Sequence, residues 1–565
     1  MPYVPPLDDY RLLLGHLTGF AKVTATERFA EAGGDTAEAI LTEAGRLAAD
    51  VLAPLQRPGD LHPARLENGV VRTSPGFAEG FRAIAEGGWI GISAEESSGG
   101  MGLPLTLATA VNEMFSGGCL ALQLAPLMSQ GQIEALEHHA SDELKALYLP
   151  KLTSGDWIGT MNLTEPQAGS DVGALTTKAE PKGDGTYAIT GQKIYITWGD
   201  NDFTENVCHL VLARLPDGPS GTKGISLFMV PKYLPQDDGT PGEANALRVV
   251  SLEHKLGLHG SPTAVMSYEG ATGWLVGAEH GGMAAMFTMM NNARLGVGTQ
   301  GIGVAEAATQ LAMAYASDRK QGRASGRGTI IEHADVRRML ATMQAQTFAA
   351  RAIALMCAGA LDMARATGDA AQAARGALLT PIAKAFGTDT GCEVAQMGIQ
   401  VHGGMGFIEE TGAAQLARDV RVTAIYEGTN GIQALDLVGR KLMDGGEAAF
   451  ALIDSVITEA EGARATRPVL ADHLWQAAES LREATEHLVA LEPAARGEVA
   501  VPYLRAFALV LGGQAHLCAA AHGGPERQAL AAFYLRRMLP EHAGLLAHVR
   551  EAGEAGLPAA DELLA

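Results

Sequence analysis

The spacing of apolar residues changes twice along the chain of 565 residues, and this limits the folds that the chain can adopt. Up to about residue 155, apolar residues recur at i, i+3, i+4 and i+7, which places them on one face of a helix. From Trp157 to about Val276 the period is two, as in a strand with one buried face. The helical spacing returns after His280. The sequence therefore predicts an α+β protein, with a β-domain between helical regions and a first region that is entirely helical.

These changes predict four domains. We expect an N-terminal helical domain (1–155), a middle β-domain of barrel or sandwich type (156–278), a helical bundle (279–445) and an additional C-terminal helical domain (446–565). The last domain carries an apolar stripe that needs a partner surface, so we expect it to pack on the rest of the chain. The members of this stripe are Leu474, Ala478, Leu481 and Leu488.

The charge balance excludes one class of partner. The chain has 42 Lys and Arg against 64 Asp and Glu, a formal net charge of −22. Such a surface repels phosphate backbones and anionic membranes, so we expect no nucleic acid partner. The five cysteines are too far apart for a CxxC pair or a compact zinc site, and we interpret them as reduced core thiols without a metal.

The chain shows no clear targeting signal. Its first residues contain Asp8 and Asp9 before an apolar run, unlike the basic start of a signal peptide. The longest uncharged stretch, 506–525, is interrupted by Gly, Gln and His, which favours a buried helix over a membrane span. We therefore expect a cytoplasmic protein without a transmembrane segment.

The stretch 296–301 (GVGTQG) fits the glycine pattern G-x-G-x-x-G of dinucleotide-binding folds. That pattern requires a preceding strand, so that the next helix can point its N-terminus at a pyrophosphate. Here the preceding residues have helical spacing, and no βαβ unit follows. We expect these glycines to allow close packing of helices instead.

Five other segments could carry chemistry, but each also has an ordinary structural explanation. Stretch 161–171 could offer hydrogen-bond donors to a ligand, or could be an ordinary polar turn. Stretch 193–199 could line a bound flavin ring, or could be a strand that packs on a core. Stretch 318–323 is a cationic cluster that could bind an anion, or could only complement the dipole at the end of a helix. The glycines of 400–407 could let the backbone approach a ligand closely, or could only turn the chain. In 425–433, Glu427 is either a desolvated general base or an exposed glutamate.

The order and spacing of these segments resemble the acyl-CoA dehydrogenase family over roughly residues 90–440. The shared motifs are TEPxxGSD, KxYIT, NNAR, DRKQGR, QxxGGxGF and RDxRxxxIYEGT. The first residues (YVPPLDDYRLLL) and the helical region after residue 445 resemble a long-form subgroup that includes 3-methylmercaptopropionyl-CoA dehydrogenases. The α, β, α order that the periodicity predicts agrees with the fold of this family.

The resemblance implies an FAD-dependent enzyme that converts an acyl-CoA thioester to trans-2-enoyl-CoA. Glu427 would remove the α-proton while a hydride leaves the β-carbon for flavin N5, and the electrons would pass to an electron-transfer flavoprotein or an equivalent acceptor. Some members place the base where this chain has Ala293, which cannot act as one. Alternatives are an acyl-CoA oxidase of the same fold, reoxidised by dioxygen, and an inactive acyl-CoA-binding flavoprotein. A nicotinamide dehydrogenase ranks last.

The same resemblance implies the remaining site residues. FAD would be bound by Met161, Leu163, Thr164, Gly169, Ser170, Tyr195, Thr197, Arg319, Gln321, Gln400, Gly404 and Thr429, and the substrate by Ser170, Asn291, Arg294, Glu427 and Gly428. Among the FAD-binding residues, Arg319, Gln321, Gln400 and Gly404 would hold the pyrophosphate and adenosine of a cofactor bound in a neighbouring subunit, which implies a homodimer. Many relatives have glutamine where this chain has Gly431.

Overall fold

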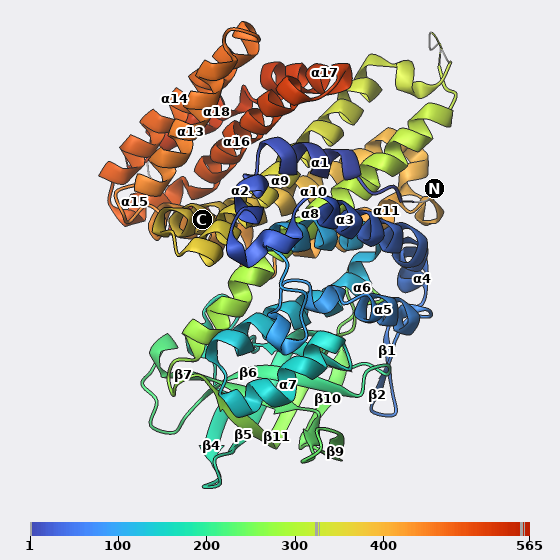
Figure 1. Cartoon of the computed structure of the whole chain (residues 1–565), viewed down its shortest axis with the longest axis vertical. Coiled ribbons are helices and arrows are strands. Elements are labelled where there is room, and N and C mark those ends of the chain that lie inside the picture. Colours follow the sequence, from blue (N-terminus) through green and yellow to red (C-terminus); the bar gives the residue numbers. More distant parts are fainter. Residues whose placement is uncertain (1–2, 323–325, 327, 554–556, 559, 565) are drawn as a thin grey trace.

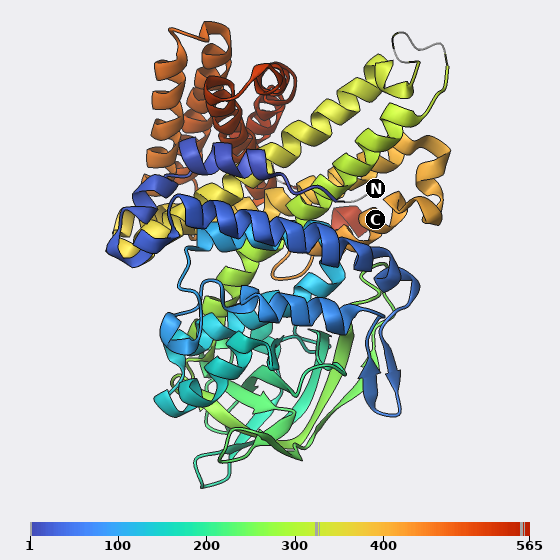
Figure 2. The same cartoon turned by 45° about the vertical axis from the view of Figure 1, so that its right-hand side comes forward.

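The computed structural model describes residues 3–322, 326, 328–553, 557–558 and 560–564. The β-domain lies at one end of the long axis, the helical bundle in the middle, and the C-terminal helices beside the bundle at the other end (Figures 1 and 2). The mixture of helical regions and one β-domain confirms the predicted α+β class.

The N-terminal region is helical except for one hairpin. Its helices are α1 (Leu7–His16), α2 (Phe20–Thr24), α3 (Asp35–Leu47), α4 (Gln56–Leu61), α5 (Phe77–Glu86), α6 (Leu105–His139) and α7 (Asp142–Ser154). Strands β1 (Arg65–Glu67) and β2 (Val70–Arg72) pair antiparallel, so the expectation of an entirely helical region is wrong. Asn68 and Gly69 form the turn with positive φ angles of 52° and 80°. This Asn-Gly pair is a strong hairpin signal that the helical periodicity around it masked.

The β-domain is a closed barrel with additional strands. Its main strands are β3 (Trp157–Asn162), β4 (Lys178–Pro181), β5 (Tyr187–Thr197), β6 (Asn206–Arg214), β7 (Ile225–Pro231), β10 (Leu247–Leu252) and β11 (Thr263–Val276). Pairing runs from β11 through β5, β4, β6 and β7 back to β11, which closes a ring. Strand β3 pairs parallel to β6 outside this ring, and β8 (Tyr233–Pro235) and β9 (Pro241–Ala244) form a separate hairpin.

The bundle is built on long helices, α8 (Gly282–Asp318), α9 (Ala334–Thr367) and α10 (Ala370–His402), followed by the short helices α11 (Ala413–Val420) and α12 (Asn430–Gly439). The glycine-rich stretch 296–301 lies within α8. A Cβ atom on Gly301 would lie 2.3 Å from the carbonyl oxygen of Gly387, and one on Gly298 would lie 2.8 Å from that of Ala383. These glycines therefore let α8 and α10 approach closely, as predicted.

The C-terminal helices share their apolar core with the bundle. They are α13 (Glu447–Ala463), α14 (Pro468–Ala490), α15 (Pro493–Glu498), α16 (Ala500–His522), α17 (Pro525–Phe533), α18 (Glu541–Arg550) and α19 (Ala560–Leu564). The predicted stripe of α14 is fully buried, in one cluster with Ile302 of α8, Ile353 of α9 and Phe386 of α10. The prediction that this region packs on the rest of the chain is confirmed.

A buried ion cluster joins helices from distant parts of the sequence. The guanidinium of Arg351 (α9) lies 2.6 Å from Asp9 (α1), and 2.7 Å from each of Glu113 (α6) and Glu306 (α8). Arg527 of α17 also pairs with Asp9. Removing one partner from such a cluster leaves a buried charge uncompensated, which is strongly destabilising. The cluster therefore ties the first helix to both the bundle and the C-terminal region.

By length and composition alone, α6, α9 and α16 are apolar enough to cross a membrane. In this fold 94%, 83% and 89% of their most apolar windows are buried inside the protein. Their hydropathy is thus explained by the core of the protein. The absence of a transmembrane segment stays a prediction.

Candidate active site

The turn that contains Glu427 has an uncommon backbone conformation. It lies between the 3₁₀ segment Arg421–Ala424 and helix α12. Glu427 has φ +54° and Gly428 has φ +84°, so two successive residues are left-handed. Glycine adopts this conformation without penalty, whereas glutamate does so only where its surroundings hold it. The polar contacts around the turn are therefore important for its shape.

Several side chains hold this turn. The hydroxyl of Tyr426 donates a hydrogen bond to Oε1 of Gln300 on α8. The amide of Gln433 donates to the carbonyl oxygens of Glu427 and Gly428 at 3.3 and 3.4 Å. Thr429 caps α12 by accepting from the backbone N–H of Ile432 at 3.2 Å. Thr429 thus has a structural role whether or not it also contacts a cofactor.

The surroundings of Glu427 suit a proton acceptor. Burial raises the pKa of its carboxyl to about 7, and the positive charges of Arg294 and Lys384 oppose that rise. Arg294 is itself buried, 3.6 Å from Asp436 and 3.4 Å from the side-chain oxygen of Asn291. A carboxylate with a raised pKa accepts a proton from a weak carbon acid more readily than an ordinary glutamate does.

A second group of predicted residues lies on the β-domain. Met161 is on β3, Thr164 follows that strand, and Tyr195 and Thr197 are on β5. The N–H of Ile194 donates to the carbonyl of Thr164 at 2.9 Å, which brings the two segments side by side. Tyr195 has φ +61° and is 61% exposed, although both neighbours in sequence are at least partly buried. An exposed aromatic ring beside hydroxyl donors fits a planar, hydrogen-bonding cofactor such as a flavin. Leu163 is half-buried beside this surface, and Gly169 and Ser170 are exposed in the loop after β3.

A buried ion pair that was not predicted fixes this loop. Lys193 donates from Nζ to Oε1 of Glu165 and to the carbonyl of Leu163, each at 2.9 Å. The carboxylate of Glu165 also accepts from the N–H groups of Thr176 and Thr177 at 2.7 and 3.0 Å. Burial alone would raise the pKa of Glu165, but Lys193 and these donors lower it to about 2. Both residues lie in quoted motifs, but their pairing spans 28 residues and no local pattern reveals it.

The third group of predicted residues lies where α8 and α10 end. Tyr315 and His402 stack with ring centroids 4.4 Å apart, which brings these ends together. The residues predicted to bind FAD there, Arg319, Gln321, Gln400 and Gly404, are all exposed. Exposed cationic and amide donors fit a pyrophosphate supplied by a second subunit. Arg323, from the same motif, lies outside the described residues.

A cleft of about 480 Å³ lies between α6, α8, α9 and α10 and reaches Arg294. Gln130, Glu134, Asn291 and Asp436 also line it, whereas Glu427 and Gly428 are not among its lining residues. Arg294 therefore connects the cleft with the base candidate. The volume of this cleft is sufficient for a small acyl group.

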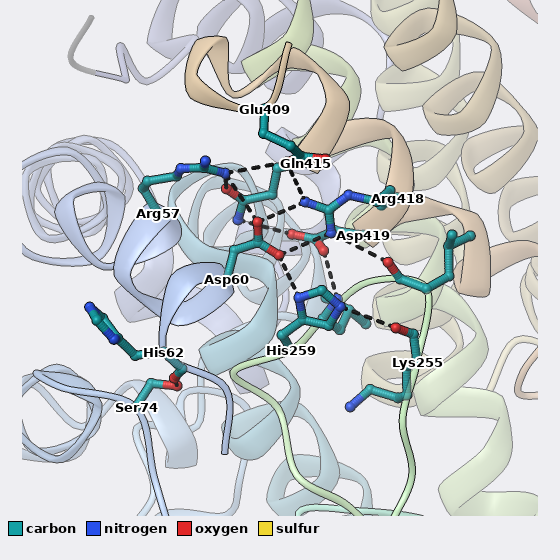
Figure 3. Close-up of polar contacts among 12 residues, drawn as sticks. Arg57, Asp60, His62, Ser74, Lys255, His259, Glu409, Gln415, Arg418 and Asp419 are labelled. Carbon is teal, nitrogen blue, oxygen red and sulfur yellow. Dashed lines mark hydrogen bonds and ion pairs between the residues drawn. The ribbon is translucent and has the colours of Figure 1, made fainter. Parts of the chain in front are cut away.

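A polar junction supports the helix that leads to the Glu427 turn (Figure 3). Asp60 of α4 accepts two hydrogen bonds from Arg418 of α11 at 3.0 and 2.7 Å, and pairs with His259 at 2.8 Å. Asp419 accepts from the N–H of Leu258 at 2.6 Å. Burial opposes the ionisation of Asp60, but Arg418 and its other cationic neighbours outweigh this and lower its pKa. The junction joins the N-terminal region, the loop before β11 and α11.

Comparison with known proteins identifies the family. The chain matches the acyl-CoA dehydrogenase N-terminal domain over 34–156, the middle domain over 160–271 and the C-terminal domain over 280–443. Residues 449–557 match the domain described as acetyl-CoA dehydrogenase C-terminal like. The chain belongs to the acyl-CoA dehydrogenase family, a family of FAD-binding oxidoreductases.

Within this family the chain is similar to a long relative. It is 46% identical to the 3-methylmercaptopropionyl-CoA dehydrogenase of Ruegeria pomeroyi, over 87% of this chain and 85% of the relative. The predicted resemblance, including the extra C-terminal region, is therefore confirmed.

Solved structures show the same fold. Caenorhabditis elegans ACDH-11 in complex with C11-CoA superposes with a TM-score of 0.80 at 21% identity, covering 99% of this chain and 96% of that one. The Bacillus anthracis acyl-CoA dehydrogenase complexed with FAD has a TM-score of 0.76 at 20% identity, covering 97% and 92%.

Proposed function

We propose that the chain is an FAD-dependent acyl-CoA dehydrogenase that converts an acyl-CoA thioester to trans-2-enoyl-CoA with Glu427 as the base. The observation that carries this proposal is the raised pKa of Glu427 together with its fixed backbone conformation. Glu427 is held in a left-handed turn beside Arg294 and Lys384. An ordinary surface glutamate has neither the desolvation nor the fixed backbone.

The residues of the chain have distinct tasks in this reaction. Glu427 takes the α-proton of the thioester, and the electron pair of that C–H bond becomes part of the new α,β double bond. The backbone N–H of Glu427 is oriented by the fixed turn and is our candidate donor to the thioester oxygen, which acidifies the α-carbon. FAD, when bound, would supply the acceptor for the hydride that leaves the β-carbon. Met161, Thr164, Tyr195 and Thr197 are the residues that we expect to hold its ring.

The relatives and the cleft support a short acyl group as the substrate. The Ruegeria relative acts on 3-methylmercaptopropionyl-CoA, a short acyl thioester, according to its name. The cleft beside Arg294 is lined in part by polar side chains such as Gln130, Glu134 and Asn292. The chain is also 37% identical to the butyryl-CoA dehydrogenase of Syntrophomonas wolfei, over 72% of this chain and 70% of the relative. We therefore propose a short acyl group, with 3-methylmercaptopropionyl-CoA and butyryl-CoA as the first candidates.

We also propose that the enzyme is a homodimer, because Arg319, Gln321, Gln400 and Gly404 are exposed residues that a cofactor site between subunits would use. A cytoplasmic location is a separate proposal, based on the sequence alone. The electrons would pass to an electron-transfer flavoprotein or an equivalent acceptor.

One experiment tests the function and its two alternatives. The purified yellow protein is mixed anaerobically with saturated acyl-CoAs of graded length and with 3-methylmercaptopropionyl-CoA, and flavin bleaching is followed by absorbance. Bleaching with formation of the enoyl-CoA supports a dehydrogenase or an oxidase. Stoichiometric release of peroxide in air, at a rate equal to turnover with an artificial acceptor, would indicate the oxidase. The absence of bleaching by every acyl-CoA would indicate an inactive flavoprotein.

A further inference from the structure

The side chain of Lys384 on α10 reaches the turn that carries the base. It is buried, and its Nζ donates to the carbonyl oxygen of Gly428 and to Oδ1 of Asn430, each at 2.9 Å. These acceptors are the first and third residues after Glu427. The lysine is 44 residues from Gly428 in sequence, so the contact exists only in the folded protein.

Asn430 connects the same turn to α10 in a second way. Its side-chain amide donates to Oδ1 of Asp389 at 2.7 Å and to the hydroxyl of Thr388 at 3.0 Å. Two successive turns of α10 thus hold the start of α12 through a lysine, a threonine and an aspartate. With Gln433 bonded to the carbonyl oxygen of Glu427, both peptide groups that follow the base are fixed.

Lys384 and Glu427 also interact through their charges. Burial lowers the pKa of Lys384 to about 8, and the negative charge of Glu427 opposes this fall. The other groups that face the pair are Arg294 from α8, Asp389 and Cys392 from α10, and Tyr426 beside the base. The positive charges of Arg294 and Lys384 partly offset the rise in the pKa of Glu427 that burial causes. An ammonium in this position favours the ionised base.

We propose that Lys384 is a positioning residue that fixes the Glu427–Gly428 turn through the Gly428 carbonyl and Asn430 and keeps the carboxylate of Glu427 in its proton-accepting form. This inference rests on the proposed role of Glu427 as the base. It assigns to a residue of α10, far from the motif that contains the base, control over both the geometry and the ionisation of that base.

The test compares substitutions that separate hydrogen bonding from charge. Lys384→Met removes both, Lys384→Gln keeps a donor but no charge, and Lys384→Arg keeps the charge. Lys255→Met is the matched control, because Lys255 is a half-buried lysine whose pKa desolvation also lowers to about 8, and it donates to the carbonyl of Ser261 at 2.9 Å. Each holoenzyme is assayed for flavin reduction by butyryl-CoA or 3-methylmercaptopropionyl-CoA, whichever reduces the wild-type flavin faster, from pH 5.5 to 9.

We expect the acid limb of the pH profile to move to higher pH by about half to one unit in Lys384→Met and Lys384→Gln, because an opposite charge near a carboxyl commonly lowers its pKa by about one unit or more. Lys384→Arg should keep the limb near that of the wild type, and Lys255→Met should leave it unchanged. Hydrogen exchange of peptides covering 425–433 should be faster in Lys384→Met than in the wild type and unchanged in Lys255→Met.

An acid limb and an exchange pattern in Lys384→Met that equal those of the wild type would overturn the inference. If Lys384→Met does not fold, the comparison of Lys384→Gln with Lys384→Arg decides, and identical acid limbs in these two overturn it. The proposed function fails separately, if the wild-type flavin is reduced by no acyl-CoA. In that case faster exchange in Lys384→Met still supports the structural part of the inference.

Discussion

The hydroxyl of Tyr426 and the side-chain oxygen of Gln300 form a hydrogen bond across 126 residues of sequence. Gln300 lies in the glycine-rich part of α8 and donates in turn to Gln123 of α6 at 3.0 Å. The residue before the proposed base is thus connected to two helices of the core. The glycines that bring α8 against α10 and the glutamine that holds the Glu427 turn belong to the same short stretch.

Removing this hydroxyl should affect both stability and catalysis. Tyr426→Phe leaves the oxygen of Gln300 without its donor, which costs about 1–3 kcal/mol for a buried group. We expect a lower midpoint of thermal unfolding and slower flavin reduction. Tyr503→Phe is the control, because Tyr503 is a buried tyrosine bonded to Thr485 at 2.9 Å in the C-terminal region. It should lower the midpoint without slowing flavin reduction. Equal rates in Tyr426→Phe and the wild type would contradict a role for this contact in catalysis.

Glu427→Gln tests the base directly. The amide keeps the size of the side chain but accepts no proton, and general-base catalysis contributes about 10²–10⁴-fold, so flavin reduction should slow by at least roughly a hundredfold. Rapid-mixing absorbance measures this rate. The FAD content should stay at the wild-type level, because the carboxylate faces the substrate in the proposed mechanism. A near wild-type rate would require another base.

The pH dependence of kcat/KM should report the ionisation of Glu427. Burial raises the pKa of its carboxyl to about 7. In the proposed mechanism the ionised form is the active one. The value of kcat/KM should therefore rise with pH up to about 7 and level off above it, with a slope of about tenfold per pH unit on the acid side. The Glu427→Gln variant should show no such limb in its residual activity. A wild-type profile that is flat between pH 5.5 and 8 would contradict this prediction.

The same pKa shift predicts a stability difference with a definite sign. A carboxyl whose pKa is raised in the folded state binds its proton more tightly there, so the folded state loses stability as pH rises from the ordinary glutamate value toward 7. Glu427→Gln removes this loss, and should be more stable than the wild type by up to about 3 kcal/mol at pH 8, because the folded-state pKa of about 7 lies well above the ordinary value of 4.5. The difference should be smaller at pH 6. Thermal midpoints of both proteins at the two pH values measure it, and a less stable variant at pH 8 would contradict the burial of this charge.

Arg319 should contribute to FAD retention. A charge-assisted contact to a pyrophosphate is roughly twice as strong as a neutral hydrogen bond, so Arg319→Ala should lose flavin faster during dialysis. Arg536→Ala, which removes an exposed arginine of the C-terminal region, is the control and should retain its flavin. Unchanged flavin content in a folded Arg319→Ala protein would remove Arg319 from the cofactor site.

The oligomeric state is a separate prediction. Light scattering at micromolar concentration should give twice the chain mass of 58.9 kDa. We expect the C-terminal helices to cover the surface that tetrameric relatives use for a second dimer contact. A tetramer would show that this surface, or another, is still available for assembly.

Local patterns were sufficient for most elements, whereas the base candidate came from the resemblance to the family. The period-two stretch 187–197 is strand β5, and the stripe of α14 is buried as predicted. What the sequence could not reveal depends on pairs that only folding brings together. The Lys193–Glu165 ion pair and the contact of Lys384 with Gly428 both join residues whose separation follows no periodic rule. The hairpin at Asn68–Gly69 is different, since its turn signal was present and was outweighed by the helical spacing on both sides.

Because the bundle and the C-terminal helices share one apolar core, the fold of the bundle depends on the presence of the C-terminal helices. A chain ending near residue 445 would uncover the parts of α9 and α10 that pack against α13 and α16, and would deprive Asp9 of Arg527. Truncation alone therefore does not give a stable shorter enzyme, because α9 and α10 have apolar surfaces that the C-terminal helices cover. A chimera that joins this C-terminal region to a short relative would need those apolar surfaces as well.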